Sequence, residues 1–443
     1  MRIRVSTRVA AFFALALLVP LIAACGGGGD DEDQPTATAT PDSAATSVSS
    51  PVTTAAPEAT GTQRSTPALP TQPPPGPSPT PPATFTPAPT PGPTRTSTVD
   101  HRTEEFAYGW NVAWRGDDNG ADFNQQTIGA VQDSGFGWVR FQVEWSQFER
   151  APDAWDPLPV DRVVDAYAAA GINVLIVVAK APQWAVDPNG DQLLADWGEF
   201  EQFMFFMADR YKGKVQAWEI WNEQNLASEM GGTVRPRDYF ELLKAGSAGV
   251  RAGDPDAKVV FGGLTPNGVN DPSIAYDDLQ YLQLIYGLNG GEISQYFDIM
   301  GMHLSSTHND PDWMYPDNPG TEQGYNDHAS FFFRRGEQLR QVMLNNGDDA
   351  KPVWITEFGW TTENQAPGYE YGVNNTEEEV AQFLVRAFEI ATTEWDFVTG
   401  AFVWNLNWST LAPPESEISP WSALNADWTP RPAYEALKAM PKE

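Results

Sequence analysis

The stretch Asn173-Val174-Leu175-Ile176-Val177-Val178-Ala179 is apolar at every position after its first residue. A strand that is buried on both faces needs such a continuous apolar run, because neither face meets water. Parallel sheets that are covered by helices contain strands of this kind. The stretch therefore predicts a parallel sheet inside a layer of helices.

Seven further runs rich in β-branched and aromatic residues are predicted to be strands. They are Tyr108–Trp114, Trp138–Val143, Ala217–Trp221, Lys258–Gly263, Ile299–His303, Val353–Phe358 and Gly400–Asn405. Helical spacing of apolar residues falls between them, at Val160–Ala170, Asp196–Tyr211, Tyr239–Ala252, Phe331–Asn345 and Glu377–Thr393. Eight strands that alternate with helices predict an α/β fold, the (β/α)8 TIM barrel. An open doubly wound sheet is the alternative, but no Gly-rich fingerprint follows the first strand.

The 443 residues divide by composition into three parts. Residues 1–24 begin with three arginines and continue with a short apolar run, which is typical of a signal peptide. Residues 25–100 hold 17 of the 38 prolines and one aromatic residue, so this segment is predicted to be a disordered linker rich in Pro, Thr and Ser. Residues 101–443 contain no second break of this kind and are predicted to be one barrel domain.

The apolar run ends in Ile22-Ala23-Ala24-Cys25, and four glycines follow. This segment resembles a bacterial lipobox, in which Cys25 would be lipidated and become the mature N-terminus. The chain's only cysteine stands at the position that a lipobox requires. The alternative is an ordinary signal peptide cut near Ala24. We therefore expect the protein on the extracellular face of the cell membrane, held by a lipid anchor only, or secreted.

Composition excludes several classes of function. A net charge of −32 disfavours nucleic acid and anionic polysaccharides as partners. One cysteine excludes an intramolecular disulfide, and four histidines disfavour a multi-histidine metal site. The Asp/Asn/Gly clusters at 117–120 and 187–191 have calcium-like spacing but are typical of turns, so we expect neither metal nor cofactor. Aromatic residues make up 12% of the chain, and such side chains suit the flat faces of sugar rings.

Two glutamates follow predicted strands in sequences rich in tryptophan. They stand in Trp218-Glu219-Ile220-Trp221-Asn222-Glu223-Gln224-Asn225 and Trp354-Ile355-Thr356-Glu357-Phe358-Gly359-Trp360. The chemistry of a parallel barrel lies at the carboxyl ends of its strands, so Glu223 and Glu357 are expected at one rim. Neighbouring tryptophans can raise the pKa of a carboxyl group. Glu219, in mid-strand, is expected to point into the barrel or to pair with a core charge.

Two carboxyl groups across one bowl are what glycosidic hydrolysis requires. The motifs around them resemble those of clan A glycoside hydrolases, most closely families 39 and 5. Trp221-Asn222-Glu223 matches the acid/base motif after strand four, and Thr356-Glu357-Phe358-Gly359 matches the nucleophile motif after strand seven. The segments 138–149, 181–185 and 428–434 are also similar to those families. The resemblance spans residues 106–440.

The resemblance implies a role for each matching polar residue. Glu223 would be the acid/base and Glu357 the nucleophile of a retaining reaction. Their carboxyl groups would then lie about 5–5.5 Å apart. Asn222 would bond the sugar 2-hydroxyl, and Arg140 would hold the nucleophile region ionised. His303, after strand six, would stand near the acid/base.

Aromatic residues are the further candidates. Trp404, after strand eight, would floor the subsite of the cleaved sugar, and Trp184 and Trp114 are candidates to face the ligand. The chain departs from its relatives in one place. Many of them carry His-x-Tyr in strand six, whereas this chain has His303-Leu304-Ser305. We therefore expect a different hydrogen-bond environment around the nucleophile but the same nucleophile.

These observations predict a retaining glycosidase that cleaves O-glycosidic bonds in an extracellular oligo- or polysaccharide, and we expect these bonds to be β-linkages. It would act as a monomer with a carbohydrate substrate. A non-catalytic carbohydrate-binding lipoprotein on a barrel scaffold is the alternative, because a fold does not imply its function. A solute-binding lipoprotein is a third, but it needs two lobes and a hinge, and the sequence gives no such boundary.

Overall fold

The structure is a computed structural model that describes residues 97, 99–101, 105–304, 306–316 and 328–442. The predicted signal segment, Cys25, almost all of the predicted linker and Ser305 lie outside the described residues. Among the helices of the described part, none is both long enough and apolar enough to cross a membrane.

Eight parallel strands close into a barrel in the order β1-β10-β9-β8-β5-β4-β3-β2. The predicted (β/α)8 fold is therefore confirmed. The strands are β1 (Ala107–Asn111), β2 (Trp138–Glu144), β3 (Asn173–Ala179), β4 (Ala217–Ile220), β5 (Lys258–Phe261), β8 (Ile299–His303), β9 (Val353–Phe358) and β10 (Val398–Val403). A two-stranded antiparallel hairpin, β6 (Asn270–Asp271) and β7 (Ala275–Tyr276), interrupts the loop after β5.

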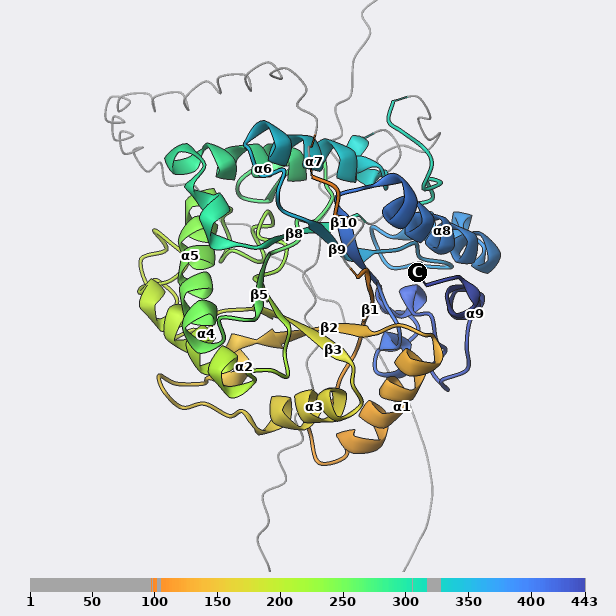
Figure 1. Ribbon diagram of the computed structural model, residues 1–443, viewed down its shortest axis with the longest axis horizontal. Helices are drawn as coiled ribbons and strands as arrows, with labels where there is room; N and C mark the ends of the chain where they lie inside the picture. Colours follow the sequence, from red (N-terminus) through yellow and green to blue (C-terminus); the bar gives the residue numbers. More distant parts are fainter. Residues whose placement is uncertain (1–96, 98, 102–104, 305, 317–327, 443) are drawn as a thin grey trace, which may run out of the picture. The chain divides into compact units, whose positions relative to one another are not determined.

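Helices surround the strands, as Figure 1 shows. They are α1 (Gly120–Asp133), α2 (Trp145–Phe148), α3 (Leu158–Ala169), α4 (Trp197–Arg210), α5 (Pro236–Gly253), α6 (Asp278–Gly287), α7 (Arg335–Asn345), α8 (Glu377–Glu389) and α9 (Pro432–Ala439). The predicted Phe331–Asn345 helix begins later, at Arg335, because a separate 3-10 turn covers Ala329–Phe331. The last residues of the predicted Glu377–Thr393 helix form a π-turn.

Apolar packing fills the barrel below its rim. Seven buried apolar residues cluster inside it, one from each strand except β2: Ala107, Leu175, Ala217, Val260, Ile299, Trp354 and Phe402. A side chain at Gly109 would collide with the Phe402 ring, because its Cβ would lie 2.1 Å from a ring carbon. The much larger second cluster lies between the strands and the helices. The polar site above this floor is therefore held by a rigid, packed base.

Four predicted strands end earlier than expected. The β4 strand stops at Ile220 instead of Trp221, and β5 stops at Phe261 instead of Gly263. The other two are β1 and β10. The β1 strand stops at Asn111 instead of Trp114, because Ala113 N–H bonds the side chain of Asn407 rather than a strand neighbour. The β10 strand stops at Val403 instead of Asn405, where the chain turns away. All four differences lie at the carboxyl ends of strands, where the loops that form the rim begin.

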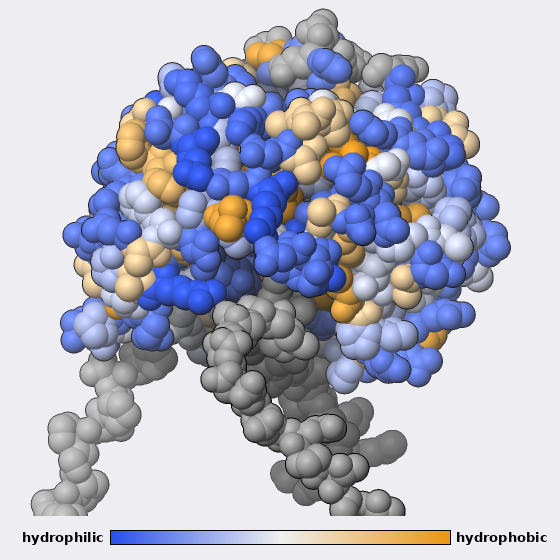
Figure 2. Space-filling model, turned by 90° about the horizontal axis from the view of Figure 1, so that it is seen from below, coloured by the Kyte–Doolittle hydropathy of each residue, from blue (hydrophilic) through white to orange (hydrophobic). Residues whose placement is uncertain are grey.

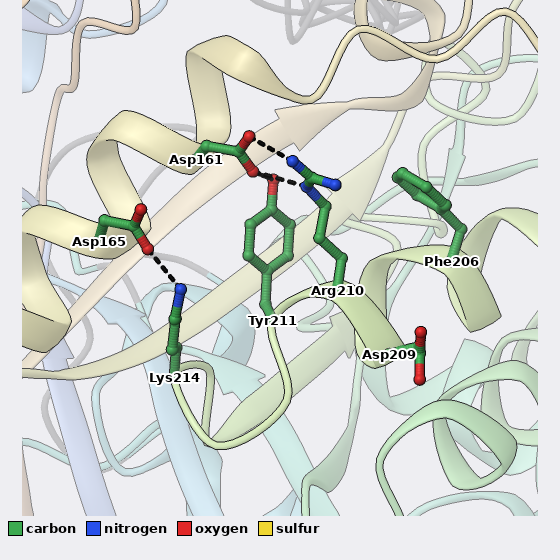
Figure 3. Close-up of a pocket in the computed structure, with 7 residues that line it drawn as sticks. All are labelled: Asp161, Asp165, Phe206, Asp209, Arg210, Tyr211 and Lys214. Carbon is green, nitrogen blue, oxygen red and sulfur yellow. Dashed lines mark hydrogen bonds and ion pairs between the residues drawn. The ribbon is translucent and has the colours of Figure 1, made fainter.

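The opposite face of the barrel carries both ends of the domain. His101 N–H bonds Asp396 O, just before β10, and the ammonium group of Lys442 lies over the Phe136 ring, just before β2. A pocket of about 410 Å³ also lies at this end, between α3 and the turn after α4. Four of its five charged side chains form two ion pairs, Asp161 with Arg210 and Asp165 with Lys214 (Figure 3).

The surface that is visible in Figure 2 is mostly hydrophilic, and its apolar side chains occur in small groups.

The turn at 187–191 explains one acidic cluster, because the Asp187 carboxylate accepts bonds from the backbone N–H groups of Asn189, Asp191 and Gln192. Its oxygens serve the backbone, as the turn interpretation predicts.

Candidate active site

Glu223 and Glu357 meet at the carboxyl-end rim of the barrel. Glu223 lies three residues after β4, and Glu357 is the fifth residue of β9. One oxygen of each carboxylate and a ring nitrogen of His303 all lie within 4.8 Å of one another. The two glutamate side chains remain 24% and 12% exposed, so both are accessible to solvent at the rim.

The loop that carries Glu223 has an unusual backbone. Trp221 and Glu223 have φ values of 69° and 50°, a region that costs a non-glycine residue about 1–2 kcal/mol. Bonds to the next loop hold this conformation. Glu223 N–H bonds Gly263 O, and the side-chain amide of Gln224 bonds Gly262 O. Strain of this kind is typical of functional sites, where it fixes the direction of a side chain.

Arg140 is the centre of the polar network. Its guanidinium group, 2% exposed, donates to Glu219 Oε2 and Glu357 Oε1 at 2.6 Å each. It also donates to Asn111 Oδ1 at 2.7 Å and to Asn222 Oδ1 at 2.8 Å. Only the planar fork of an arginine can serve four acceptors in this way. Arg140 therefore connects the nucleophile candidate with three other strands or loops.

Glu219 is fully buried beneath this network. Its Oε2 accepts from Arg140, and its Oε1 accepts from Gly263 N–H and the Thr356 hydroxyl, each at 3.0 Å. The structure thus pairs Glu219 with a core charge, as expected for a mid-strand glutamate. Its carboxylate orients Arg140 and lies out of reach of the cleft.

His303 stands between the two rim carboxylates. Its Nδ1 lies 3.3 Å from Glu223 Oε1, and its Nε2 lies 3.7 Å from Glu357 Oε1. Burial lowers the pKa of His303, but the charges of Glu357 and Glu223 outweigh burial, so its pKa is raised above 6.5. The ring is 1% exposed, and its Nδ1 lies within hydrogen-bond distance of Glu223, whereas its Nε2 is too far from Glu357 Oε1 for a hydrogen bond.

The pKa shifts of the two glutamates go in opposite directions. Burial raises the pKa of Glu357, and the charges of His303 and Arg140 offset this only in part. Burial also raises the pKa of Glu223, but the hydrogen bond and charge of His303, with smaller effects of Thr265 and Arg140, lower it overall. The expected rise at Glu223 from neighbouring tryptophans was wrong, because Trp221 is buried in the core and His303 determines the shift.

Asn222 presents an amide to the cleft. Its Oδ1 accepts from Arg140, and its Nδ2 has no bond within the described residues. The amide is therefore oriented with its N–H groups available to a ligand oxygen. This arrangement suits the predicted bond to a sugar hydroxyl.

The three tryptophan candidates follow the carboxyl ends of strands β10, β3 and β1. Trp404 is half-buried and packs near Trp408, with ring centroids 6.1 Å apart. The indole N–H of Trp184 bonds Glu149 O, and that of Trp114 bonds Gln142 O. Both of these indoles are thus fixed by main-chain atoms, and each is partly exposed.

Several residues of the site have no signal in the sequence. Asn111 bonds both Arg140 and Thr356 O, although 245 residues separate Asn111 from Thr356. Lys180 and Glu229 form an ion pair at the rim beside the Glu223 loop, at 2.6 Å. A polar residue at the end of an apolar strand, such as Asn111, is the one available hint.

The group Glu223, His303 and Glu357 contains atom types that could also hold a metal ion. The Arg140 guanidinium lies 2.6 Å from Glu357 Oε1 and would repel a cation there. The residues therefore fit proton exchange better than metal binding.

Comparison with known proteins identifies the family. The model of the family "Cellulase (glycosyl hydrolase family 5)" matches residues 99–400. Among solved structures, the chain is similar to a family 39 glycoside hydrolase from Bacteroides cellulosilyticus WH2, with a TM-score of 0.55 and 21% identity over 77% of this chain and 64% of that chain. It is also similar to a monomeric beta-xylosidase from Caulobacter crescentus CB15, with a TM-score of 0.53 and 16% identity over 78% of this chain and 69% of that chain.

A curated relative is a beta-1,4-xylanase from Dictyoglomus thermophilum, 26% identical over 129 residues. This match spans 27% of the chain and 36% of the relative, so the chain covers about a third of that protein. The family match is much longer and includes the segments that carry Arg140, Glu223 and Glu357. The chain therefore belongs to glycosyl hydrolase family 5 of clan A.

Proposed function

We propose that the protein hydrolyses β-glycosidic bonds with retention, with Glu357 as nucleophile and Glu223 as acid/base. The observation that carries this proposal is the short gap between the two carboxylates, one oxygen of each being within 4.8 Å. Retaining enzymes place their carboxyl groups about 5–5.5 Å apart, whereas inverting enzymes need about 6.5–9.5 Å to admit a water. The gap supports direct attack by a carboxylate.

Arg140 and Asn222 prepare the first step. Arg140 binds Glu357 Oε1, and within the described residues Oε2 accepts no hydrogen bond. Oε2 of Glu357 is then the oxygen that attacks the anomeric carbon. The bond from this carbon to the leaving-group oxygen breaks at the same time, and Glu223 donates a proton to the leaving-group oxygen. Asn222 Nδ2 donates to the sugar 2-hydroxyl, a bond that strengthens as the oxocarbenium-like transition state forms. Water, deprotonated by Glu223, then releases the sugar from Glu357.

His303 explains how Glu223 can donate a proton although its pKa is lowered. A protonated His303 beside an ionised Glu223 holds the same number of protons as a neutral His303 beside a protonated Glu223. The 3.3 Å contact allows the proton to pass from one to the other. The site as a whole keeps this proton until the pH exceeds the apparent pKa of the coupled groups. His303 is the most basic of the three side chains Glu223, His303 and Glu357, so its raised pKa determines the pH above which the site loses the shared proton.

This proton sharing predicts a pH effect. The alkaline limb of kcat/KM should lie above pH 6.5 in the wild type, since the pKa of His303 is raised from that value. In His303→Asn the shared proton must reside on the carboxylates alone, so the limb should move to lower pH by about one unit or more. The measurement is a pH profile of kcat/KM with an oligosaccharide, whose leaving group needs protonation. An unchanged alkaline limb would contradict this role of His303.

We propose that the substrate is a neutral β-glycan of the xylan or cellulose type. The matching relatives are described as a xylanase and a xylosidase, and the family model as a cellulase, which supports this class. Release of reducing ends from xylan, cellulose and mixed-linkage glucan tests the activity, with Glu357→Gln as control. NMR of the first anomer that forms tests retention. Equal signals from wild type and Glu357→Gln would favour a non-catalytic binding protein instead.

We also propose that Cys25 is lipidated and anchors the protein at the outer face of the cell membrane. The arginines before the apolar run and the Ile22-Ala23-Ala24-Cys25 segment motivate this proposal. The Cys25→Ala variant should move from the detergent phase to the aqueous phase in detergent partitioning. If the variant remains in the detergent phase, the anchor lies elsewhere.

A further inference from the structure

Glu417 lies in the loop between β10 and α9, and its backbone is fixed from two sides. The side-chain amide of Asn364 donates to Glu417 O at 2.8 Å. The amide of Asn405, the residue after Trp404, donates to Ile418 O at 3.4 Å. The position of residue 417 relative to Trp404 is thus determined by the loops after β9 and β10.

The side chain of Glu417 is half-buried, but within the described residues its carboxylate makes no hydrogen bond or ion pair. Burial raises its pKa, and the charge of Glu223 raises it further. The bond from Asn405 to Ile418 O holds this part of the loop beside Trp404, at the carboxyl-end rim of the barrel. A half-buried carboxylate without a partner is costly, and the protein itself provides no compensation.

A sugar ring would compensate for this cost. A carboxylate can accept bonds from two neighbouring hydroxyls, and bonds to a charged group are the stronger kind. The partly exposed rings of Trp404 and Trp408 lie on the same loop, which Asn405 connects to residue 418. A flat apolar surface beside a fixed polar group is the usual composition of a small-molecule site.

We propose that Glu417 is a substrate-binding residue that accepts hydrogen bonds from neighbouring hydroxyls of a neutral sugar beside Glu223. This inference rests on the proposed function. The same position selects against sugar acids, because the unpaired carboxylate of Glu417 would repel a substrate carboxylate. A neutral unit of a xylan or cellulose chain satisfies Glu417, and a uronic acid does not.

The test measures binding and therefore does not depend on turnover. Xylotetraose and cellotetraose are titrated calorimetrically into Glu357→Gln, alone and combined with Glu417→Ala, Glu417→Gln or Glu415→Ala. Glu415 is exposed, lies two residues away in the same loop and serves as the matched control. Loss of two bonds to a charged acceptor should raise the Kd of the better ligand about 10- to 100-fold in Glu417→Ala. Glu417→Gln should have an intermediate Kd, and Glu415→Ala should change it less than about twofold.

Stability separates this role from a structural one. Since Glu417 makes no bond within the described protein, its alanine variant should have an unchanged or higher unfolding temperature. Equal Kd values for the Glu417 and Glu415 variants would overturn the inference, and so would the absence of binding to both oligosaccharides. If the oligosaccharides bind but wild type releases no reducing ends, the proposed hydrolysis fails while the role of Glu417 is still decided by the Kd values.

Discussion

The Glu357→Ala variant should lose turnover of every substrate, by about 10⁴-fold or more, the scale that follows loss of a covalent nucleophile. The glycosyl-enzyme cannot form without this carboxylate. Glu223→Ala should instead keep the first step on an activated aryl glycoside, whose leaving group departs without protonation. Its second step should slow about 10²–10⁴-fold, because no base activates water. A burst of aryl alcohol followed by slow turnover is the expected signature.

Azide separates the two roles by stereochemistry. It needs no base, so it should restore turnover in Glu223→Ala and give the glycosyl azide with retained configuration. In Glu357→Ala it should occupy the vacated space and give the inverted product. Glu378→Ala, an exposed glutamate at the start of α8, is the control and should behave as wild type. Products of the opposite configurations would exchange the two roles, and unchanged activity in both variants would exclude the pair.

Arg140→Met should be the most destabilising single substitution in the site. It leaves the fully buried Glu219 and the nearby Glu357 without their common cation. Removal of one partner from a buried ion pair costs about 3–5 kcal/mol in unfolding free energy. Chemical denaturation of a fragment that spans residues 101–443 measures this directly.

Two controls accompany that measurement. Arg115→Met breaks an exposed pair with Asp117, for which about 0–1 kcal/mol is expected. Arg140→Lys keeps the charge but cannot serve four acceptors, so its loss should lie between the other two. A loss in Arg140→Met as small as in Arg115→Met would show that Glu219 and Glu357 do not depend on this arginine.

The barrel was predictable because its strands must be apolar on both faces. The boundaries of β3, β8 and β9 agree with the sequence prediction, because each contains an apolar run, which in β8 and β9 is followed by the polar residues of the rim. The α1 helix was not predicted, because its buried residues are few and include Asn124 and Thr127, and an Asp/Asn/Gly turn precedes it. Helices that are anchored by so few apolar side chains have weak periodicity.

The site was predictable only where a local motif carried it. Asn222, Glu223 and Glu357 lie in such motifs, and the structure brings them together with Arg140 and His303. The roles of Asn111 and Thr356 depend on register between distant strands, which no local pattern encodes. The pKa of Glu223 was predicted in the wrong direction for the same reason. Its neighbour His303 is 80 residues away in sequence and 3.3 Å away in space.

Both ends of the domain lie at the face of the barrel opposite to the cleft, near Asp396 and Phe136. An attachment through either end therefore leaves the mouth of the cleft open to a long polymer. Immobilisation on beads through a tag, or fusion to a second module at residue 101 or 442, should preserve access to insoluble substrates. Grafting into the loops after β8 or β10 would instead obstruct the polymer's path.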